Sequence, residues 1–372
     1  MEKLAKYREI GIRSHGRGIF HKPLKTGTDL GAKRIFAIEP GDIVLNIVFA
    51  WEGAVALAGS AERGMCGSHR FPTYRPIGEE CDARYIVEYL RSDLGLRILG
   101  DASPGSAGRN RTLNQSALLD AEILLPTVVE QRRTIDLLAA IDSATDALTL
   151  VVDRVTSAQA ACRHELIDAG GWPKQSLAEV IRIDARLVDP TQAVYAGLPH
   201  VGVDRIESAT GRLLALRSAA EDGVTSGKYL FGPEEVVYAK IRPNLRKVAW
   251  PRVTGLASAD AYPLCSTDGI DPAFLQHLLL TDCFSNEAAS RSGRTKMPKI
   301  NRKELLSIRV PVPPVAEQRR IASVLNAMAE VYAAAHEERE CVQRLRAACI
   351  HDVLTGRHEI PSSYDVALES AS

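Results

Sequence analysis

Paired cysteines, net charge and long apolar runs are all missing from this sequence. Its seven cysteines include no Cys-x-x-Cys pair, so a disulfide scaffold or a zinc finger is not expected, and the thiols are predicted to be reduced. Lysine and arginine number 46 and so do aspartate and glutamate. This balance argues against a polybasic nucleic-acid binder and against an acidic disordered chain, since 45% of the residues are hydrophobic and can form a core.

No segment has the length or composition of a membrane span. The most apolar run, residues 43–58, is interrupted by Asn46, Glu52 and Gly53 and is too short to cross a bilayer. The first residues, MEKLAKYREIG, lack the apolar stretch of a secretory signal. We therefore expect a cytoplasmic protein with no membrane partner.

Signatures of catalysis are also missing. The sequence has no phosphate-binding GxxxxGK[ST] loop, no HExxH or GxSxG motif, no Asn/Asp-Pro-Pro-Tyr tetrapeptide of amino-methyltransferases, and no Pro-Asp dipeptide to open a nuclease site. No GxGxxG follows a strand and opens a helix. We therefore predict no catalytic residues, no metal site and no cofactor on this chain.

What the chain does have is an internal duplication. LLPTVVEQRRTIDLLAAID, from Leu124, matches VPVPPVAEQRRIASVLNAM, from Val310, at an offset of 187 residues. The same offset pairs Asn114 with Asn301 and His164 with His351, so the register holds without a gap for more than fifty residues. The chain is a tandem repeat with a pseudo-twofold relation between its halves.

The matching segments are predicted to be long helices over residues 127–168 and 314–355. Thr127 and Glu130 form a capping-box pattern, and Pro314 suits the first turn of a helix. At 1.5 Å per residue each helix would be about 63 Å long, so the two are expected to pack on each other, antiparallel, as a coiled-coil spacer. The predicted seam consists of Leu137, Ile141, Ala144, Leu148, Val151, Val155, Ala158 and Cys162, with their repeats Val324, Met328, Val331, Ala335, Glu338, Val342, Leu345 and Cys349.

The segments before each helix read as mixed α/β. Strands are predicted at residues 35–38, 43–48, 54–57, 201–203, 229–231, 236–241 and 307–312, and short helices at 85–94 and 272–280. The fold class is therefore α/β (α+β): two tandem α/β domains separated by two long antiparallel helices. The predicted divisions are 1–123, first domain; 124–170, first helix; 171–312, second domain; 313–358, second helix; and 359–372, tail. The first repeat lacks a counterpart to roughly Ser176–Thr191, so we expect its domain to be shortened at the N-terminus.

Charge is unevenly distributed between these parts. Basic residues outnumber acidic ones by 17 to 14 in residues 1–120 and by 19 to 15 in residues 172–312. Acidic residues lead by 8 to 4 in residues 121–171 and by 9 to 6 in residues 313–372. In the second domain, residues 240–247 and 291–303 are dense in lysine and arginine and contain no acid. Such loops suit contacts with DNA phosphates and guanine edges, although a solvated surface is the simpler alternative.

The duplicated box at Pro126–Arg133 and Pro313–Ile321, each time following a variable α/β segment, resembles the specificity subunit of type I restriction-modification systems. Residues 202–213 and 237–243 are similar to motifs of that family's second domain, and residues 18–20, 48–54 and 67–71 are similar to one of its recurring domain types. The resemblance covers nearly the whole chain.

The resemblance implies two target-recognition domains, each reading one half of a bipartite, asymmetric site in double-stranded DNA. The helices would set the gap between the half-sites, and two methyltransferase subunits, which carry S-adenosylmethionine, would dock on the chain. Restriction/translocase subunits would join for cleavage. Two alternatives stay open: a structural adaptor for acidic proteins, and a self-sufficient methyltransferase or nuclease.

The residues expected to take part fall into two groups. The candidate partner contacts are Glu130, Gln131, Glu317 and Gln318, for which helix capping is an equally good explanation. The candidate DNA contacts are Arg13, His15, Arg17, Lys22, Arg70, Arg109, Arg111, Arg212, Lys240, Arg242, Asn244, Arg246, Lys247, Arg291, Arg294, Lys296 and Lys299.

Overall fold

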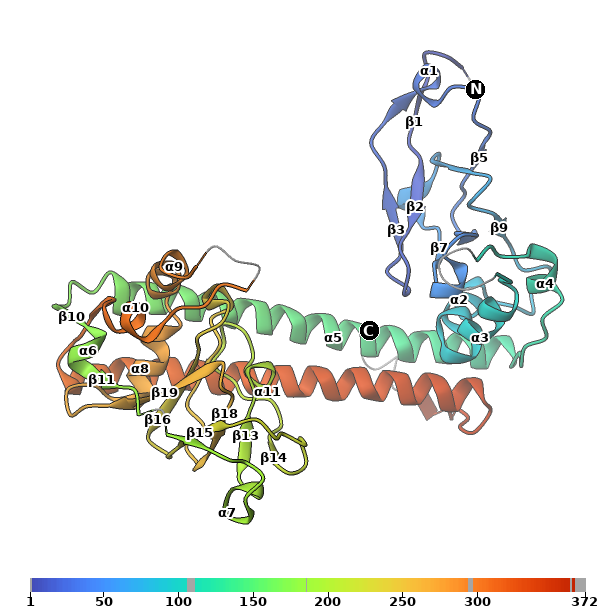
Figure 1. The fold of residues 1–372 in the computed structure, drawn as a ribbon. Helices are drawn as coiled ribbons and strands as arrows, with labels where there is room; N and C mark the ends of the chain where they lie inside the picture. The colour runs from blue at the N-terminus through green and yellow to red at the C-terminus, as the bar shows by residue number, and fades with distance from the viewer. Residues whose placement is uncertain (1, 106–110, 185, 294–296, 362, 365–372) are drawn as a thin grey trace. The chain divides into compact units, whose positions relative to one another are not determined.

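The computed structural model describes residues 2–105, 111–184, 186–293, 297–361 and 363–364. The chain divides into two compact units, one made of Met1–Asp146 with Glu340–Ser372 and the other of Ala147–Arg339. Each unit therefore contains one of the variable segments together with a part of both long helices (Figure 1).

The first unit is built on short antiparallel strands followed by helices. The strands pair as β1 (Lys6–Tyr7) with β4 (Lys25–Thr26), β2 (Ile10–Ile12) with β3 (Ile19–His21), β5 (Ile35–Ala37) with β8 (Cys66–Ser68), and β6 (Ile43–Leu45) with both β7 (Val55–Leu57) and β9 (Thr73–Tyr74). The helical elements are α1 (Gly27–Leu30), η1 (Ala50–Glu52), η2 (Ser60–Glu62), α2 (Ala83–Arg91), α3 (Asp93–Asp101) and α4 (Gln115–Leu119). Side-chain caps at Asp82, Ser92 and Asn114 begin the last three helices.

The second unit contains larger sheets. One has the order β11 (Ile181–Arg182), β19 (Ala261–Ser266), β16 (Glu235–Ala239), β17 (Val248–Ala249); another has β12 (Leu187–Val188), β15 (Lys228–Phe231), β18 (Gly255–Ala257), β13 (Pro199–Val201), β14 (Arg217–Ser218). A separate pair joins β10 (Lys174–Ser176) to β20 (Arg309–Pro311). The helical elements are α6 (Leu177–Val180), α7 (Ala193–Ala196), η4 (Val203–Arg205), η5 (Pro243–Leu245), α8 (Pro272–Leu279), α9 (Asp282–Ser290) and α10 (Arg302–Leu306).

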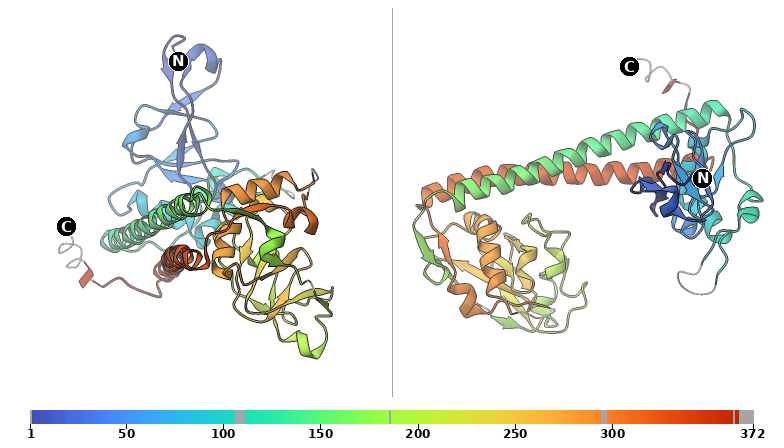
Figure 2. Two further views of the ribbon diagram at one scale, coloured as in Figure 1. Left: turned by 90° about the vertical axis from the view of Figure 1, so that its left-hand side faces the viewer. Right: turned by 90° about the horizontal axis from the view of Figure 1, so that it is seen from above.

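The two long helices are α5 (Val128–Arg163), which continues into the π-helical turn η3 (His164–Asp168), and α11 (Val315–Leu354). They lie side by side and antiparallel in each unit (Figure 2). In the first unit, Arg346 on α11 donates to Asp142 on α5 at 2.6 Å; in the second, the Gln159 amide donates to the Leu325 carbonyl at 3.2 Å. The predicted α/β class with two long antiparallel helices is confirmed.

The predicted seam between these helices is partly wrong. Val324, Val331 and Leu345 are 41%, 51% and 53% exposed, whereas the neighbouring Leu325 and Tyr332 are buried. Leu325 and Tyr332 therefore take the buried places predicted for Val324 and Val331, whereas the predicted Ala335 is buried. The burial differs from the prediction because the helix packs against α5 and against the core of the second unit together. No helix among the described residues is long and apolar enough to span a membrane.

Candidate nucleic-acid interface

A strained basic loop stands at the centre of the second unit's candidate site. Arg242 and Arg246 flank η5 and both have left-handed backbone angles, with φ of 46° and 49°. Residues other than glycine seldom adopt this conformation, and such strain concentrates at functional sites. The Arg242 and Asn244 side chains at this loop are exposed. The Arg242 guanidinium and the Asn244 amide are therefore accessible to a ligand.

The structure brings the two basic stretches of the second domain together. The Arg242 amide donates to the Pro298 carbonyl at 2.8 Å, and the Ile300 amide donates to the Lys240 carbonyl at 3.0 Å. A bridge between Ile241 and Lys299 lies between these two bonds. Residues 56 to 60 positions apart therefore form one basic surface, which we call the 242 surface. Arg294 and Lys296, also predicted here, lie outside the described residues.

Lys240 is seated between two aromatic rings. Its ammonium lies 4.8 Å from the centre of the Tyr262 ring and 5.9 Å from that of Tyr229. Burial lowers the pKa of Lys240, and the charges of Lys299 and Arg302 lower it further, while Asp260 opposes them. Lys240 is therefore half-buried, a position that the sequence pattern could not distinguish from an exposed one.

The other side chains predicted to contact DNA from the second unit form hydrogen bonds or ion pairs within the protein. Arg246 forms an ion pair with Asp282, and the Lys247 ammonium donates to the Val203 carbonyl at 2.8 Å. Arg212 donates to Glu207 at 3.3 Å. Arg291 donates to Glu287 at 2.7 Å and to Ser307 at 2.5 Å, and Lys299 pairs with Asp260 at 3.0 Å. These residues shape the surface, whereas Arg242 and Asn244 present free groups on it.

In the first unit the candidate site is the tip of the β2–β3 hairpin. Arg13, His15 and Arg17 are exposed there, and His15 has a left-handed φ of 59°. The His15 amide donates to the Glu52 carbonyl at 2.7 Å, and the Ser14 hydroxyl donates to the Glu52 carboxylate at 2.8 Å. Glu52 thus anchors a basic tip, a role that its place in an apolar run did not reveal.

The remaining predicted residues of the first unit lie on aromatic rings or at the surface. The Arg111 guanidinium lies 5.3 Å from the centre of the Trp51 ring, and the Lys22 ammonium lies 5.3 Å from that of Phe71. Arg70 is exposed. Arg109 lies outside the described residues. Among the described residues, no group of three or more His, Cys, Asp or Glu side chains is arranged to hold a metal ion.

The glutamines of the duplicated box are buried. The Gln131 amide donates to the carbonyls of Glu80 and Pro126 at 2.9 and 2.8 Å, and its oxygen accepts from the Asp82 amide at 2.8 Å. Asp82 is the N-cap residue of α2. The side chain therefore clamps α5 to the start of α2.

Gln318 repeats this arrangement in the second unit. Its amide donates to the carbonyls of Gly269 and Pro313 at 2.9 and 2.7 Å, and its oxygen accepts from Asp271, the N-cap residue of α8, at 2.8 Å. Both glutamines are 0% exposed. The prediction that they contact a partner is therefore corrected, because their polar atoms already bind their own chain.

The glutamates of the box are partly exposed. Glu130 accepts from the Thr127 amide at 2.9 Å, so the predicted capping box is present, and this hydrogen bonding lowers the pKa of Glu130. Glu317 pairs with Arg320 at 2.6 Å, which lowers the pKa of Glu317. Partner contact by these two carboxylates stays a prediction.

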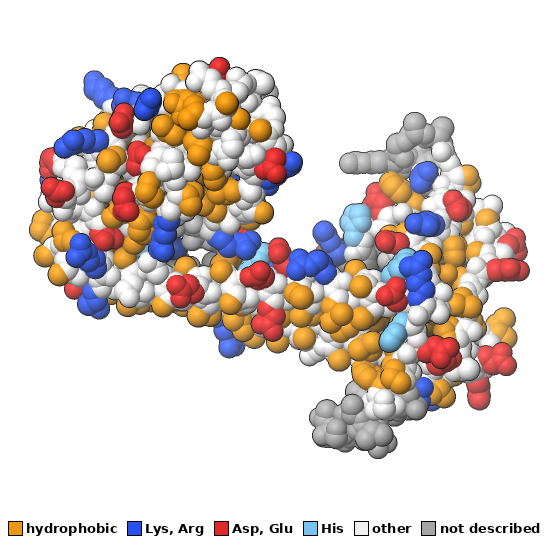
Figure 3. All heavy atoms as spheres, turned by 90° about the horizontal axis from the view of Figure 1, so that it is seen from below, with side chains coloured by type: hydrophobic (Ala, Val, Ile, Leu, Met, Phe, Trp, Pro, Cys, Tyr) orange, Lys and Arg blue, Asp and Glu red, His pale blue; other side chains and the backbone are white. Residues whose placement is uncertain are grey.

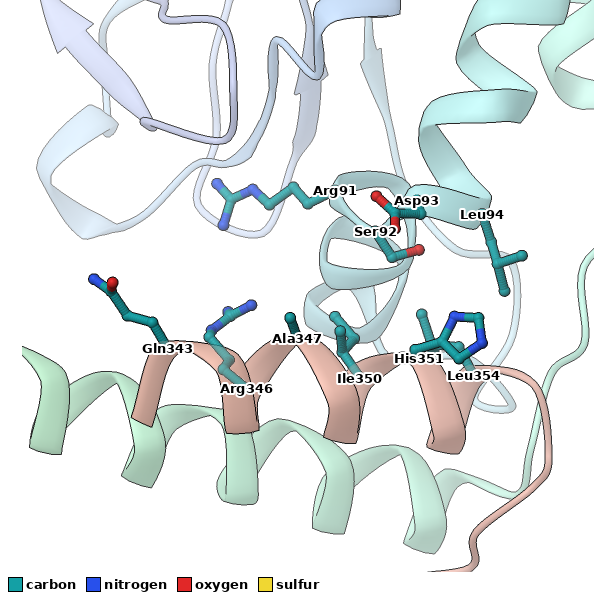
Figure 4. Close-up of a pocket in the computed structure, with 10 residues that line it drawn as sticks. All are labelled: Arg91, Ser92, Asp93, Leu94, Gln343, Arg346, Ala347, Ile350, His351 and Leu354. Atoms are coloured by element: carbon teal, nitrogen blue, oxygen red, sulfur yellow. The ribbon is translucent and has the colours of Figure 1, made fainter. Parts of the chain in front are cut away.

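A charged network joins α2 to the helices in the first unit. Arg346 donates to Glu88 at 2.8 Å as well as to Asp142, and Arg91 donates to Glu88 at 3.0 Å. These bonds raise the pKa of Arg346. Beside them is a cavity of about 210 Å³ between the α2–α3 corner and α11, with Ser92 and Asp93 facing His351 across it (Figure 4). The network holds α2 of this unit on the long helices.

Apolar side chains also reach the surface of the long helices, among scattered charged ones (Figure 3). Those with large exposed fractions are Val129, Leu150, Val151, Val324, Val331 and Leu345. Exposed apolar residues that form a contiguous patch are typical of a contact surface, whereas single ones are common on folded proteins.

The chain is similar to proteins of known type. Residues 225–340 match the family model described as the type I restriction modification DNA specificity domain. The chain is 39% identical over 150 residues to the specificity subunit of the type I restriction enzyme EcoDI of Escherichia coli, covering 40% of this chain and 33% of that subunit. It is 28% identical over 91 residues to the MjaVIII specificity subunit of Methanocaldococcus jannaschii, covering 24% and 21%. The matches thus span a third or less of these relatives.

Two solved structures share the fold. The S subunit of a type I restriction-modification system from M. genitalium has a TM-score of 0.58 at 12% identity, covering 95% of this chain and 97% of that one. A chain from a study of complex assembly in a type I system has a TM-score of 0.52 at 17% identity, covering 95% and 92%. Together with the matched domain, these findings confirm the resemblance inferred from the duplicated box.

Proposed function

Because the chain carries the DNA specificity domain of type I restriction-modification systems over residues 225–340, we propose that it is the DNA sequence-specificity subunit of such a complex. Each unit's recognition part reads one half of a bipartite, asymmetric site in double-stranded DNA. The observation that carries the proposal is the 242 surface, because its two basic stretches converge within the matched residues.

The free groups of the 242 surface suit base reading. An arginine fork bonds O6 and N7 of guanine with two hydrogen bonds, and an asparagine amide does the same for adenine N6 and N7. Arg242 and Asn244 are exposed and two residues apart on a strained loop, which restricts how they are presented. The arginines and lysines around them are paired with protein groups. They would exchange these partners for DNA phosphates, and such phosphate contacts position a protein on the duplex.

The long helices supply the second part of the proposal. A gap between half-sites requires a connection of fixed length, and α5 and α11 are helical over 36 and 40 residues. We propose that they set this gap. Removing one helical turn from both would shift the tolerated gap, and an unchanged gap would contradict this role.

We assign the catalytic steps, methylation and cleavage, to partner subunits. Two methyltransferase subunits carrying S-adenosylmethionine would dock on the duplicated helices, using the exposed apolar residues and the partly exposed Glu130 and Glu317. Restriction/translocase subunits would join this assembly in the cytoplasm. This chain itself would contribute recognition and no catalytic residue.

Competition binding in the presence of the methyltransferase partner tests the DNA assignment. We expect Arg242→Ala to weaken binding of the cognate duplex about tenfold or more, and to leave assembly with the methyltransferase unchanged. Arg154→Ala, which changes an exposed arginine on α5, is the matched control and should retain both properties. Equal DNA affinity of the Arg242 variant and the control would refute the role of the 242 surface. Loss of assembly would show that Arg242 has a structural role instead.

A further inference from the structure

Two carboxylates lie among the basic residues of the 242 surface. Asp282, the first residue of α9, pairs with Arg246, and Asp260, just before β19, pairs with Lys299 at 3.0 Å. The four side chains are between 33% and 63% exposed, so water reaches both pairs. An exposed ion pair contributes only about 0–1 kcal/mol to folding. The two carboxylates therefore matter more for the charge of the surface than for the stability of the fold.

Hydrogen bonds outside the carboxylates hold both acids beside the Arg242 loop. The Lys240 amide, two residues before Arg242, donates to the Asp260 carbonyl at 2.9 Å. The Ser285 hydroxyl of α9 donates at 3.4 Å to the carbonyl of Pro243, the residue after Arg242. A change of either aspartate to asparagine therefore removes one charge from the surface and leaves these bonds in place.

Asp282 also retains Arg246 against a repelling charge. Arg163, at the end of α5, is 5% exposed, and its hydrogen bonds to the Ala209 carbonyl and to Gln159 are long, at 3.4 and 3.5 Å. Burial and the Arg246 charge lower the pKa of Arg163 to about 10, and the Asp282 charge opposes them. Because the two guanidinium groups repel each other, Arg246 without Asp282 would be driven toward solvent, where a DNA phosphate could bind it.

A paired cation attracts DNA less than a free one. Non-specific binding comes from contacts of lysine and arginine with phosphates, which release the counterions of DNA. A carboxylate and a phosphate make similar charge-assisted hydrogen bonds with these cations, so a phosphate displaces the carboxylate only from a matching position. A duplex in a random register seldom offers that position. A duplex seated by base contacts from Arg242 and Asn244 has a fixed register and can offer it.

We propose that Asp282 and Asp260 are specificity-determining residues of the 242 surface. They keep Arg246 and Lys299 from the phosphates of non-cognate DNA and release them when base contacts have fixed the duplex. They therefore lower the affinity for non-cognate DNA more than the affinity for the cognate site. This inference rests on the proposed function, because it requires that the 242 surface binds DNA.

DNA binding at several salt concentrations tests the proposal in the complex of the full chain with its methyltransferase partner. One probe is a random-sequence duplex. The other, the selected duplex, is the sequence that the unsubstituted complex enriches from a pool of random duplexes. The variants are Asp282→Asn and Asp260→Asn, which remove a charge and keep the size of the side chain.

Each variant should bind the random duplex about fivefold more tightly than the unsubstituted complex does, because one more cation reaches a phosphate. The plot of log affinity against log salt for this duplex should steepen by about 0.9. The selected duplex should gain only about twofold and keep its slope, because its cation is already released and only the exposed ion pair is lost. The ratio of the two affinities should therefore fall.

The matched control is Asp268→Asn, which removes an exposed aspartate just beyond the opposite end of β19 from Asp260. A strand of six residues places the two ends about 20 Å apart, farther than charges act through physiological salt. Both affinities and both slopes should therefore stay unchanged in this control. Urea unfolding checks the fold of each variant, and Asp260→Asn tests the proposal independently of the contact between Asp282 and Arg163.

Equal changes in the affinity for the two duplexes would overturn the proposal, because the carboxylates would then act on all DNA alike. Weaker binding of the selected duplex by the aspartate variants would also overturn it, and would show that the carboxylates orient their cations for DNA. Arg242→Ala separates this inference from the proposed function. If Arg242→Ala keeps the selectivity of the unsubstituted complex, both fail; if it loses selectivity while the aspartate variants keep the ratio, only this inference fails.

Discussion

Replacing Gln318 by leucine tests whether the duplicated box is a structural clamp. The side chain is 0% exposed and makes three hydrogen bonds to main-chain groups, at 2.9, 2.7 and 2.8 Å. Leucine has a similar size but no polar atom. The substitution therefore leaves one amide and two carbonyls without the partner that Gln318 gives them.

The expected destabilisation is large. A buried main-chain group that loses its partner costs about 1–3 kcal/mol, so three groups cost about 3–9 kcal/mol, less whatever local relaxation recovers. A folded domain has an unfolding free energy of only about 5–15 kcal/mol. We therefore expect Gln318→Leu to unfold the second unit at a much lower urea concentration.

Tryptophan fluorescence measures this unit separately. Trp172 and Trp250 lie in the second unit, so a Trp51→Phe background removes the reporter of the first. The control is Gln192→Leu, which changes an exposed glutamine whose side chain caps no helix. If Gln318→Leu changed the unfolding free energy by no more than about 0.5 kcal/mol, as an ordinary surface substitution does, the clamp argument would be refuted.

Two further predictions concern pH and helix capping. Burial, with the Arg163 charge nearby, lowers the pKa of His277 to about 4, below its usual value of about 6.5. The unfolded chain therefore binds more protons between these values, and stability should fall by about 2 kcal/mol from about pH 7 to about pH 5. His277→Gln can keep the bond to Asn326 and should remove this loss of stability. Urea unfolding at both pH values measures it. The prediction is refuted if the unfolding free energies of the variant and of the unsubstituted protein fall by the same amount. Thr127→Ala should lower the unfolding free energy by about 1 kcal/mol and speed hydrogen exchange in the first turn of α5, and unchanged exchange there would count against the capping box.

Local sequence signals predicted the elements of the fold well. The duplication located both long helices, because capping residues and the absence of proline and glycine act within a few positions of the chain. The start of α5 at Val128, after Thr127, and of α11 at Val315, after Pro314, follow directly from them. The exposed side of α11 was predicted less well, since which residues are buried depends on partners distant in the sequence.

The candidate site was predicted in composition but not in arrangement. The sequence identified two basic stretches, and the bridge between Ile241 and Lys299 joined them. It could not show that Lys240 rests between Tyr229 and Tyr262, because cation–aromatic contacts arise between separate strands. It also could not distinguish Arg242, which is exposed, from basic neighbours that are already paired.

The burial of Gln131 and Gln318 changes what the duplicated box implies. A box that served only a partner could vary in one repeat without loss of folding, but Gln131 and Gln318 bind the N-cap residues of α2 and α8. The repeat therefore preserves the junction between a long helix and its recognition part. The loops beyond that junction are not repeated. The basic tip at His15 and the strained loop at Arg242 differ in sequence and in backbone conformation. Two similar junctions that carry two different basic loops fit the proposal that one chain reads an asymmetric, bipartite DNA site.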